Sequence, residues 1–174
     1  MTTQQRITLK AVKHAEFASE ETPCYEANVY FDGKLFAKVS NEGRGGCDSE
    51  YVTNPAVYKA ARDYIDTLPP AVTEYDDPKV EGQKFTYPRS LETECHRLLD
   101  LWLAAKDLKR AMKNKWLFQR EPKGGIYAIK RLPSGETADM VIKALRQTYP
   151  AANLLNALPE AEALDLYVEF TAPR

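Results

Sequence analysis

The stretch that decides the fold is residues 25–39, YEANVYFDGKLFAKV, which carries two alternating runs of apolar and polar residues on either side of Asp32 and Gly33. Alternation with a period of two is typical of strands that bury one face. The Asp-Gly pair supplies the positive φ angles of a type I′ turn, so the two runs predict a tight β-hairpin. Residues 7–12 alternate in the same way, and we therefore expect a three-stranded antiparallel meander.

Helical periodicity follows the meander. Asn54 and Pro55 supply an N-cap and a first helical residue, and they predict a short helix that ends before residue 69. Ser90 caps the longest predicted helix, in which apolar residues recur at helical spacing as far as residue 112. Residues 69–89 lie between these helices and are rich in Pro, Asp, Glu and Gly, so we expect an irregular surface connection there.

A second hairpin is predicted where residues 115–119 and 126–130 flank a turn of Pro, Lys and two Gly. Three elements are expected to follow: an amphipathic helix opening at Glu136 or Thr137, a short helical piece over 154–158, and a segment over 164–170 that fits either strand or helix. The sequence thus predicts the α+β class, with an N-terminal three-stranded antiparallel meander, a long amphipathic helix, a second β-hairpin and C-terminal helices.

The composition is that of a globular protein. The 174 residues are 44% hydrophobic and 28% charged, and one core of that size is common, so we expect a single domain over residues 1–174. A net charge of −1 gives no overall attraction to nucleic acid or to an anionic membrane. Because the N-terminus lacks a signal-peptide pattern and no stretch approaches the roughly 18 apolar residues of a membrane span, we expect a cytoplasmic protein with no membrane partner.

The most unusual stretch is FAKVSNEGRGGC, residues 36–47, whose glycine-rich part follows the third predicted strand. Successive glycines let backbone N–H groups converge on one anion, with Arg44 as a charged clamp and Asn41 as a side-chain donor. The predicted ligand- or anion-binding residues are Asn41, Gly43, Arg44, Gly45, Gly46 and Cys47. The alternative is a turn that only reverses the chain, with Asn41 capping its own backbone. The spacing matches neither a P-loop nor a dinucleotide-binding fingerprint.

No catalytic residue, metal-ligand set or cofactor is predicted. Three scattered cysteines and two histidines contain no Cys-x-x-Cys pair and no local ligand pair, which argues against a zinc site. Cys47 could act as a nucleophile only with a base, for which His14 is the candidate. His96 follows Cys95 directly on a helix, where neighbouring side chains diverge and cannot form a dyad. An inert thiol is the commoner case, and the pattern leans away from an enzyme.

A basic run extends from the long helix into the second hairpin. Seven of its residues form the predicted surface for a partner or for nucleic acid: Lys106, Lys109, Arg110, Lys113, Lys115, Arg120 and Lys123. Trp116, Phe118 and Tyr127 lie among them, and such a surface could follow a phosphate backbone and stack a base. The alternative is a solvated helix end beside a hairpin whose aromatic side chains face the core. The net charge of −1 favours this alternative, because it is unusual for a dedicated nucleic-acid binder.

Two stretches of the chain resemble an uncharacterised group of small bacterial and bacteriophage proteins. They are KVSNEGRGGC at residues 38–47, and DLKRAMKNKWLFQ at residues 107–119 followed by the Gly-Gly turn and IYAIKR. The resemblance covers residues 25–131, with Asn41 and the glycines and cysteine of the loop as matching positions. It implies an accessory protein of phage or mobile-element type and no cofactor.

Three functions are therefore expected, in order of preference. The first is a non-enzymatic binding protein that engages a host or phage protein through the glycine-rich loop and the basic helix-hairpin, in the manner of an inhibitor of a host process or defence. The second is a small-ligand or nucleotide sensor that uses the loop as an anion nest. The third is a nucleic-acid-binding protein. The sequence does not predict the oligomeric state.

Overall fold

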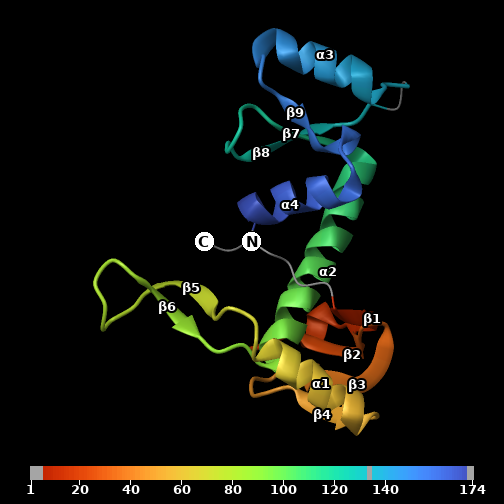
Figure 1. Ribbon diagram of the computed structural model, residues 1–174. Coiled ribbons are helices and arrows are strands. Elements are labelled where there is room, and N and C mark those ends of the chain that lie inside the picture. The colour runs from red at the N-terminus through yellow and green to blue at the C-terminus, as the bar shows by residue number, and fades with distance from the viewer. Residues whose placement is uncertain (1–5, 133–134, 172–174) are drawn as a thin grey trace. The chain divides into compact units, whose positions relative to one another are not determined.

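A computed structural model describes residues 6–132 and 135–171 of the chain and has the α+β architecture that the sequence predicts (Figure 1). The chain forms two compact units, Met1–Asp100 and Leu101–Arg174, and each is described by itself. The long helix α2 (Leu91–Asn114) begins in the first unit and ends in the second. The expectation of a single domain stays a prediction.

The first unit is built on a four-stranded antiparallel sheet in the order β1-β2-β3-β4. Its strands are β1 (Ile7–His14), β2 (Cys24–Phe31), β3 (Lys34–Glu42) and β4 (Ser49–Val52). Asp32 and Gly33 have φ angles of 47° and 76°, as the predicted turn requires, and they close the hairpin of β2 and β3. The meander is confirmed, whereas the edge strand β4 was missed because its mostly exposed side chains show no alternation in burial.

A short helix packs against this sheet. Helix α1 (Pro55–Ile65) begins as predicted, with Asn54 Oδ1 accepting a hydrogen bond from the Val57 amide at 3.2 Å. Its aromatic side chains meet those of the sheet, since the ring centroids of Phe36 and Tyr58 are 6.1 Å apart. Phe36 is fully buried, and burial of an aromatic side chain of this kind contributes roughly 1.5–3 kcal/mol to folding.

The prediction of an irregular connection over residues 69–89 is wrong. The segment forms an antiparallel hairpin of its own, made of β5 (Ala71–Asp76) and β6 (Lys84–Tyr87) (Figure 1). All four side chains of β6 are exposed, so the strand has no buried face and leaves no periodic signal in the sequence. Pro, Asp and Gly are also depleted in ordinary strands, which explains why composition favoured a loop.

The second unit contains the C-terminal half of α2 and a three-stranded sheet in the order β8-β7-β9. Its remaining elements are β7 (Lys115–Gln119), β8 (Ile126–Lys130), α3 (Ala138–Thr148), β9 (Asn153–Leu154), the 3-10 turn η2 (Leu155–Ala157) and α4 (Glu160–Thr171). The predicted hairpin and the Thr137 cap of α3 are confirmed. The segment over 164–170, which fitted strand or helix, is helical.

Strand β7 is covered on both faces. Trp116 and Phe118 belong to a core cluster with Leu145 of α3, whereas Leu117 belongs to a second cluster with Leu155 and with Leu108 of α2. Four consecutive residues of β7 are therefore buried, and its sequence does not alternate between apolar and polar residues.

Candidate functional site

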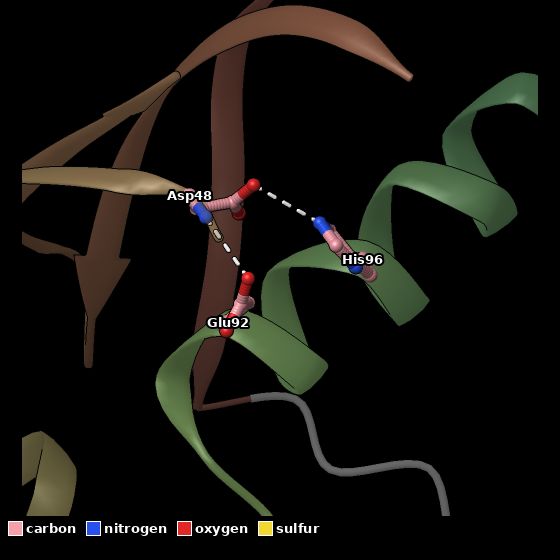
Figure 2. A group of neighbouring side chains, drawn as sticks. All are labelled: Asp48, Glu92 and His96. Atoms are coloured by element: carbon pink, nitrogen blue, oxygen red, sulfur yellow. Dashed lines mark hydrogen bonds and ion pairs between the residues drawn. The ribbon is translucent and has the colours of Figure 1, made fainter. Parts of the chain in front are cut away.

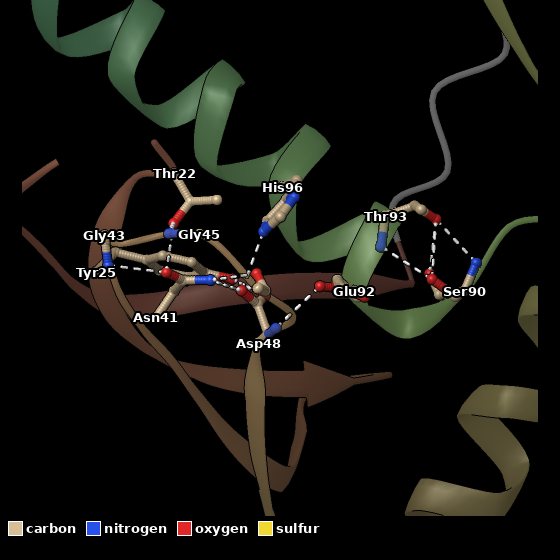
Figure 3. Close-up of polar contacts among 11 residues, drawn as sticks. Thr22, Tyr25, Asn41, Gly43, Gly45, Asp48, Ser90, Glu92, Thr93 and His96 are labelled. Atoms are coloured by element: carbon tan, nitrogen blue, oxygen red, sulfur yellow. Dashed lines mark hydrogen bonds and ion pairs between the residues drawn. The ribbon is translucent and has the colours of Figure 1, made fainter. Parts of the chain in front are cut away.

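A glycine bend between β3 and β4 is fastened to the connection between β1 and β2 (Figure 3). Gly43 is buried, and its carbonyl oxygen accepts a backbone hydrogen bond of 2.8 Å from Glu20. The Gly43 amide donates to Asn41 Oδ1 at 2.9 Å, and the Gly45 amide donates to Thr22 Oγ1 at 3.2 Å. Two of the amides that an anion nest would use are thus engaged within the protein.

Asn41 holds the bend together through both ends of its carboxamide. Its side chain is buried, and Oδ1 accepts a second hydrogen bond of 2.7 Å from Thr22 Oγ1. Nδ2 donates to the Gly46 carbonyl and to Asp48 Oδ1, both at 3.2 Å. This arrangement agrees with the alternative in which Asn41 caps its own backbone, because its polar atoms are used to shape the loop.

The exposed members of the predicted set are Arg44, Gly46 and Cys47. Ligand binding at the bend stays a prediction that depends on these three residues. His14, the candidate base for Cys47, has its Nε2 3.3 Å from Ser19 Oγ.

A cluster of metal-ligating side chains that the sequence did not predict lies beside the bend (Figure 2). Asp48 comes from the end of the bend, and Glu92 and His96 come from the first turns of α2. His96 Nε2 is 3.0 Å from Asp48 Oδ1, and the Asp48 amide donates to Glu92 Oε1 at 2.9 Å. One ligand atom from each of the three side chains lies within 4.8 Å of the other two.

Tyr25 of β2 completes the surroundings of Asp48. Its hydroxyl donates to Asp48 Oδ2, and its ring meets the His96 imidazole edge-on with centroids 6.1 Å apart. Burial and this hydrogen bond raise the pKa of Tyr25 far above its ordinary range, so the phenol remains a donor. Burial alone would raise the pKa of Asp48, but hydrogen bonds from His96, Tyr25 and Asn41 hold it below its ordinary value. Asp48 is therefore a carboxylate.

His96 lies in an acidic environment. The hydrogen bond to Asp48 raises the pKa of His96, burial opposes that effect, and the negative charges of Asp48, Glu92 and Asp100 raise the pKa further. Glu92, His96 and Asp100 follow one another at four-residue spacing, which puts them along one face of α2. By contrast, the neighbouring Cys95 thiol is fully buried, and burial raises its pKa.

The sequence contained a signal for part of this cluster. The pattern Glu-x-x-x-His near the start of a helix places two metal-ligating side chains side by side. Asp48 is 44 residues before Glu92 in the chain, and only the fold brings it to the same point. No pair of neighbouring Cys and His residues marks this set, because two of its three ligands are carboxylates.

The predicted basic surface lies in the second unit. All seven of its residues are exposed: Lys106, Lys109, Arg110, Lys113, Lys115, Arg120 and Lys123. Arg110 forms an exposed ion pair of 2.9 Å with Asp107, and Arg120 stacks over the Tyr127 ring at 3.8 Å. The basic residues therefore present cations to solvent, although Arg110 is engaged in an ion pair and Arg120 in a cation–π contact.

The aromatic side chains of this region do not offer the stacking surface that nucleic-acid binding would use. Trp116 and Phe118 are each 4% exposed and belong to the core of the unit. Tyr127 is 40% exposed, but Arg120 covers its ring. These positions agree with the alternative in which the aromatic residues of the hairpin face the core.

An apolar groove of about 400 Å³ opens beside the basic residues. Its floor is formed by apolar side chains of α2, η2 and α4, among them Leu108, Leu155 and Ala163. Its rim carries the exposed cations Lys109, Lys113 and Arg131, with Glu160 as the single acidic residue of the lining. The groove thus combines an apolar floor with a positively charged edge.

Fold and sites together define an α+β protein with a hydrogen-bonded glycine bend in one unit and a basic-edged apolar groove in the other. Comparison with protein-family models, with curated proteins and with solved structures finds no match for this chain. Among the residues that the structure describes, no helix combines the length and the apolar character needed to cross a membrane.

Proposed function

We propose that this chain is a non-enzymatic binding protein whose second unit engages an acidic segment of a partner protein in the groove between α2, η2 and α4. The single observation that carries the proposal is the pairing of an apolar floor with a rim of three cations and one carboxylate. A volume of about 400 Å³ is in the range of small ligand pockets and accommodates one or two large apolar side chains as anchors.

Charge complementarity identifies the chemistry of the occupant. Lys109 and Lys113 lie one helical turn apart on α2. The third cation of the lining, Arg131, has its guanidinium group over the Trp116 ring, 4.1 Å from the ring centroid. A segment with apolar anchors flanked by Asp or Glu satisfies both floor and rim, as amphipathic helices do when they bind in grooves. A polyanion without apolar groups would leave the floor uncovered.

The role as a phage-type accessory protein that inhibits a host process remains a hypothesis, and so does a contribution from Arg44, Gly46 and Cys47 of the bend. Both depend on the identity of the partner. The groove proposal depends only on the chemistry of its lining residues.

A displayed peptide library tests the proposal, with Leu and Phe anchors flanked either by acidic or by basic residues. We expect the purified protein to enrich the acidic-flanked members. The double variant Lys109→Glu with Lys113→Glu should weaken binding of a selected peptide at least about tenfold, because two attractions worth roughly 0.5–1 kcal/mol each are lost and each reversed charge adds a repulsion.

The matched control is Lys38→Glu with Lys143→Glu, which makes the same change in net charge at exposed positions that do not line the groove. This control should bind the selected peptide as the wild type does. Equal enrichment of basic-flanked peptides, or an equal loss of affinity in the control, would overturn the proposal. Tighter binding of a single-stranded oligonucleotide that depends on Lys109 and Lys113 would favour nucleic-acid binding instead.

A further inference from the structure

We propose that Asp48, Glu92 and His96 form a binding site for a divalent transition-metal ion, for which Zn²⁺ is the test ion. The inference concerns the first unit and is independent of the groove in the second. Among the described residues, these three are the one group of metal-ligating side chains whose ligand atoms all lie within 4.8 Å of one another (Figure 2).

The spacing of these atoms is close to that of a metal site. Zn²⁺ lies about 2.0–2.2 Å from imidazole nitrogen and carboxylate oxygen, so ligand atoms around it stand roughly 3–3.5 Å apart. His96 Nε2 and Asp48 Oδ1 are already 3.0 Å apart. Glu92 and His96 share one face of α2, so small rotations of their side chains suffice to turn both ligand atoms toward one ion.

The carboxylate of Asp48 is held in place by groups that would not compete for the ion. Tyr25 donates to its Oδ2, and Asn41 donates to its Oδ1 at 3.2 Å (Figure 3). Asn41 is in turn fixed by Thr22 and by the backbone of the bend. Hydrogen bonds of this kind orient metal-binding carboxylates and strengthen the site.

Glu92 is anchored by the backbone of the bend. Its Oε1 accepts the Asp48 amide at 2.9 Å, which leaves the second carboxylate oxygen available to an ion. The Asp48 side chain is fully buried, whereas the His96 side chain is about one-third exposed, so water can reach the site at His96. Three protein ligands with one position open to water is a common arrangement for zinc.

Charge favours a cation at this point. Two carboxylates and the nearby Asp100 surround one imidazole, and their negative charges act together on His96. An ion with a double positive charge would offset this excess. Imidazole is a ligand for Zn²⁺ and related transition metals, whereas Ca²⁺ and Mg²⁺ prefer all-oxygen sets, so we expect selectivity for the former.

The experiment is a calorimetric titration of Zn²⁺ into chelator-treated full-length protein carrying Cys47→Ser, a change that removes the exposed thiol as a competing ligand. We expect one ion per chain. Glu92→Gln keeps an oxygen that can accept the Asp48 amide, and it should weaken binding by about two orders of magnitude. Tyr25→Phe removes only a supporting hydrogen bond and should weaken binding about tenfold.

His96→Gln and His14→Gln form the matched pair. His96→Gln should abolish tight binding, and His14→Gln, at the other histidine of the chain, should leave it unchanged. Replacement of Zn²⁺ by Co²⁺ should give visible absorption bands of a low-coordinate site in the His14→Gln protein and not in the His96→Gln protein. Circular dichroism of each variant verifies that the fold is retained.

Three results would overturn the proposal. The first is no binding of Zn²⁺ or Co²⁺ to the Cys47→Ser protein at micromolar concentrations. The second is binding that persists at full affinity in both Glu92→Gln and His96→Gln. The third is binding that His14→Gln abolishes. Any of these results would mean that the cluster is only a hydrogen-bonded link between the bend and α2. None of them would affect the proposal for the groove.

Discussion

Gly43 packs so closely against Ala18 that a Cβ atom at residue 43 would stand 2.1 Å from the Ala18 carbonyl oxygen. The same Cβ would meet the Cβ of Cys24 at 2.8 Å, and the φ angle of Gly43 is +85°. One neighbour is a backbone oxygen and the other is a Cβ atom fixed to β2, so neither can give way as the end of a flexible side chain could. Glycine is therefore required at this position by contact as well as by conformation.

The first prediction compares Gly43→Ala with Gly46→Ala. Both residues have positive φ, but a Cβ at Gly46 would meet open space. Gly46→Ala should therefore cost only the strain of a left-handed alanine, about 1 kcal/mol, whereas Gly43→Ala should cost at least about 2 kcal/mol more. Urea unfolding followed by far-ultraviolet circular dichroism measures the difference. Equal losses would contradict the close contact with Ala18.

The second prediction concerns the donors of Asn41. Asn41→Asp replaces an amide that donates to Asp48 and Gly46 with a carboxylate that repels Asp48, so we expect a loss of about 2–3 kcal/mol. Unfolding is measured with chelator present. The control is Asn28→Asp, which is paired in the sheet with Lys10 and Lys38 and should be tolerated. A destabilisation no larger than that of the control would exclude Asn41 as the residue that organises the bend.

The third prediction is a titration. Arg6 forms a two-point ion pair with Asp32 at 2.9 Å and 2.6 Å, and its hydrogen bonds lower the pKa of Asp32. A lowered pKa in the folded state means that the stabilisation is present above the ordinary pKa of Asp and is lost as pH falls through the folded value. NMR titration of the Asp32 carboxyl should show a pKa below the ordinary value in the wild type and near it in Arg6→Gln.

The control for this titration is Lys13→Gln. Lys13 pairs with Glu26 at 2.5 Å and lowers the pKa of Glu26 by the same kind of hydrogen bond. The variant should raise the pKa of Glu26 and leave that of Asp32 unchanged. An Asp32 titration that is identical in the wild type and in Arg6→Gln would show that the ion pair does not persist in solution.

The sequence could predict those elements that carry a local signal. Asp32-Gly33 specifies its hairpin through backbone conformation, and Asn54 and Ser90 specify helix starts through hydrogen bonds to amides three residues later. The hairpin of β5 and β6 could not be predicted, because a strand that buries neither face has no hydrophobic period. Strand β7 also lacks a hydrophobic period, because it is buried on both faces, but it was predicted through the turn that follows it.

The candidate sites also combine residues that the sequence reveals with contacts that only the tertiary structure shows. Unusual glycines identified the bend at residues 43–46, but only the fold shows that Thr22 and Asn41 take up its amides. The basic residues could be read directly, whereas the apolar floor beside them depends on α4 and η2, which are distant in sequence. Asp48 and His96 meet through tertiary structure alone, since 48 positions separate them.

The fourth prediction concerns Glu94, whose carboxylate is fully buried in the first unit. Arg89 donates to its Oε1, and Arg97 donates to its Oε2 at 3.0 Å. Glu94→Gln keeps the size of the side chain but turns one acceptor into a donor that faces a guanidinium group. A buried cation that loses its partner costs about 3–5 kcal/mol, and because both arginines reach partly into solvent we expect about 2–3 kcal/mol.

The matched control is Asp107→Asn, which breaks the exposed ion pair with Arg110 at the same three-residue spacing that separates Glu94 from Arg97. Because solvent screens that pair, the change should cost less than about 0.5 kcal/mol. Thermal and urea unfolding of the two variants measure the contrast. If Glu94→Gln is no more destabilising than Asp107→Asn, then the two arginines find water in the folded protein, and the start of α2 is held by its apolar contacts instead.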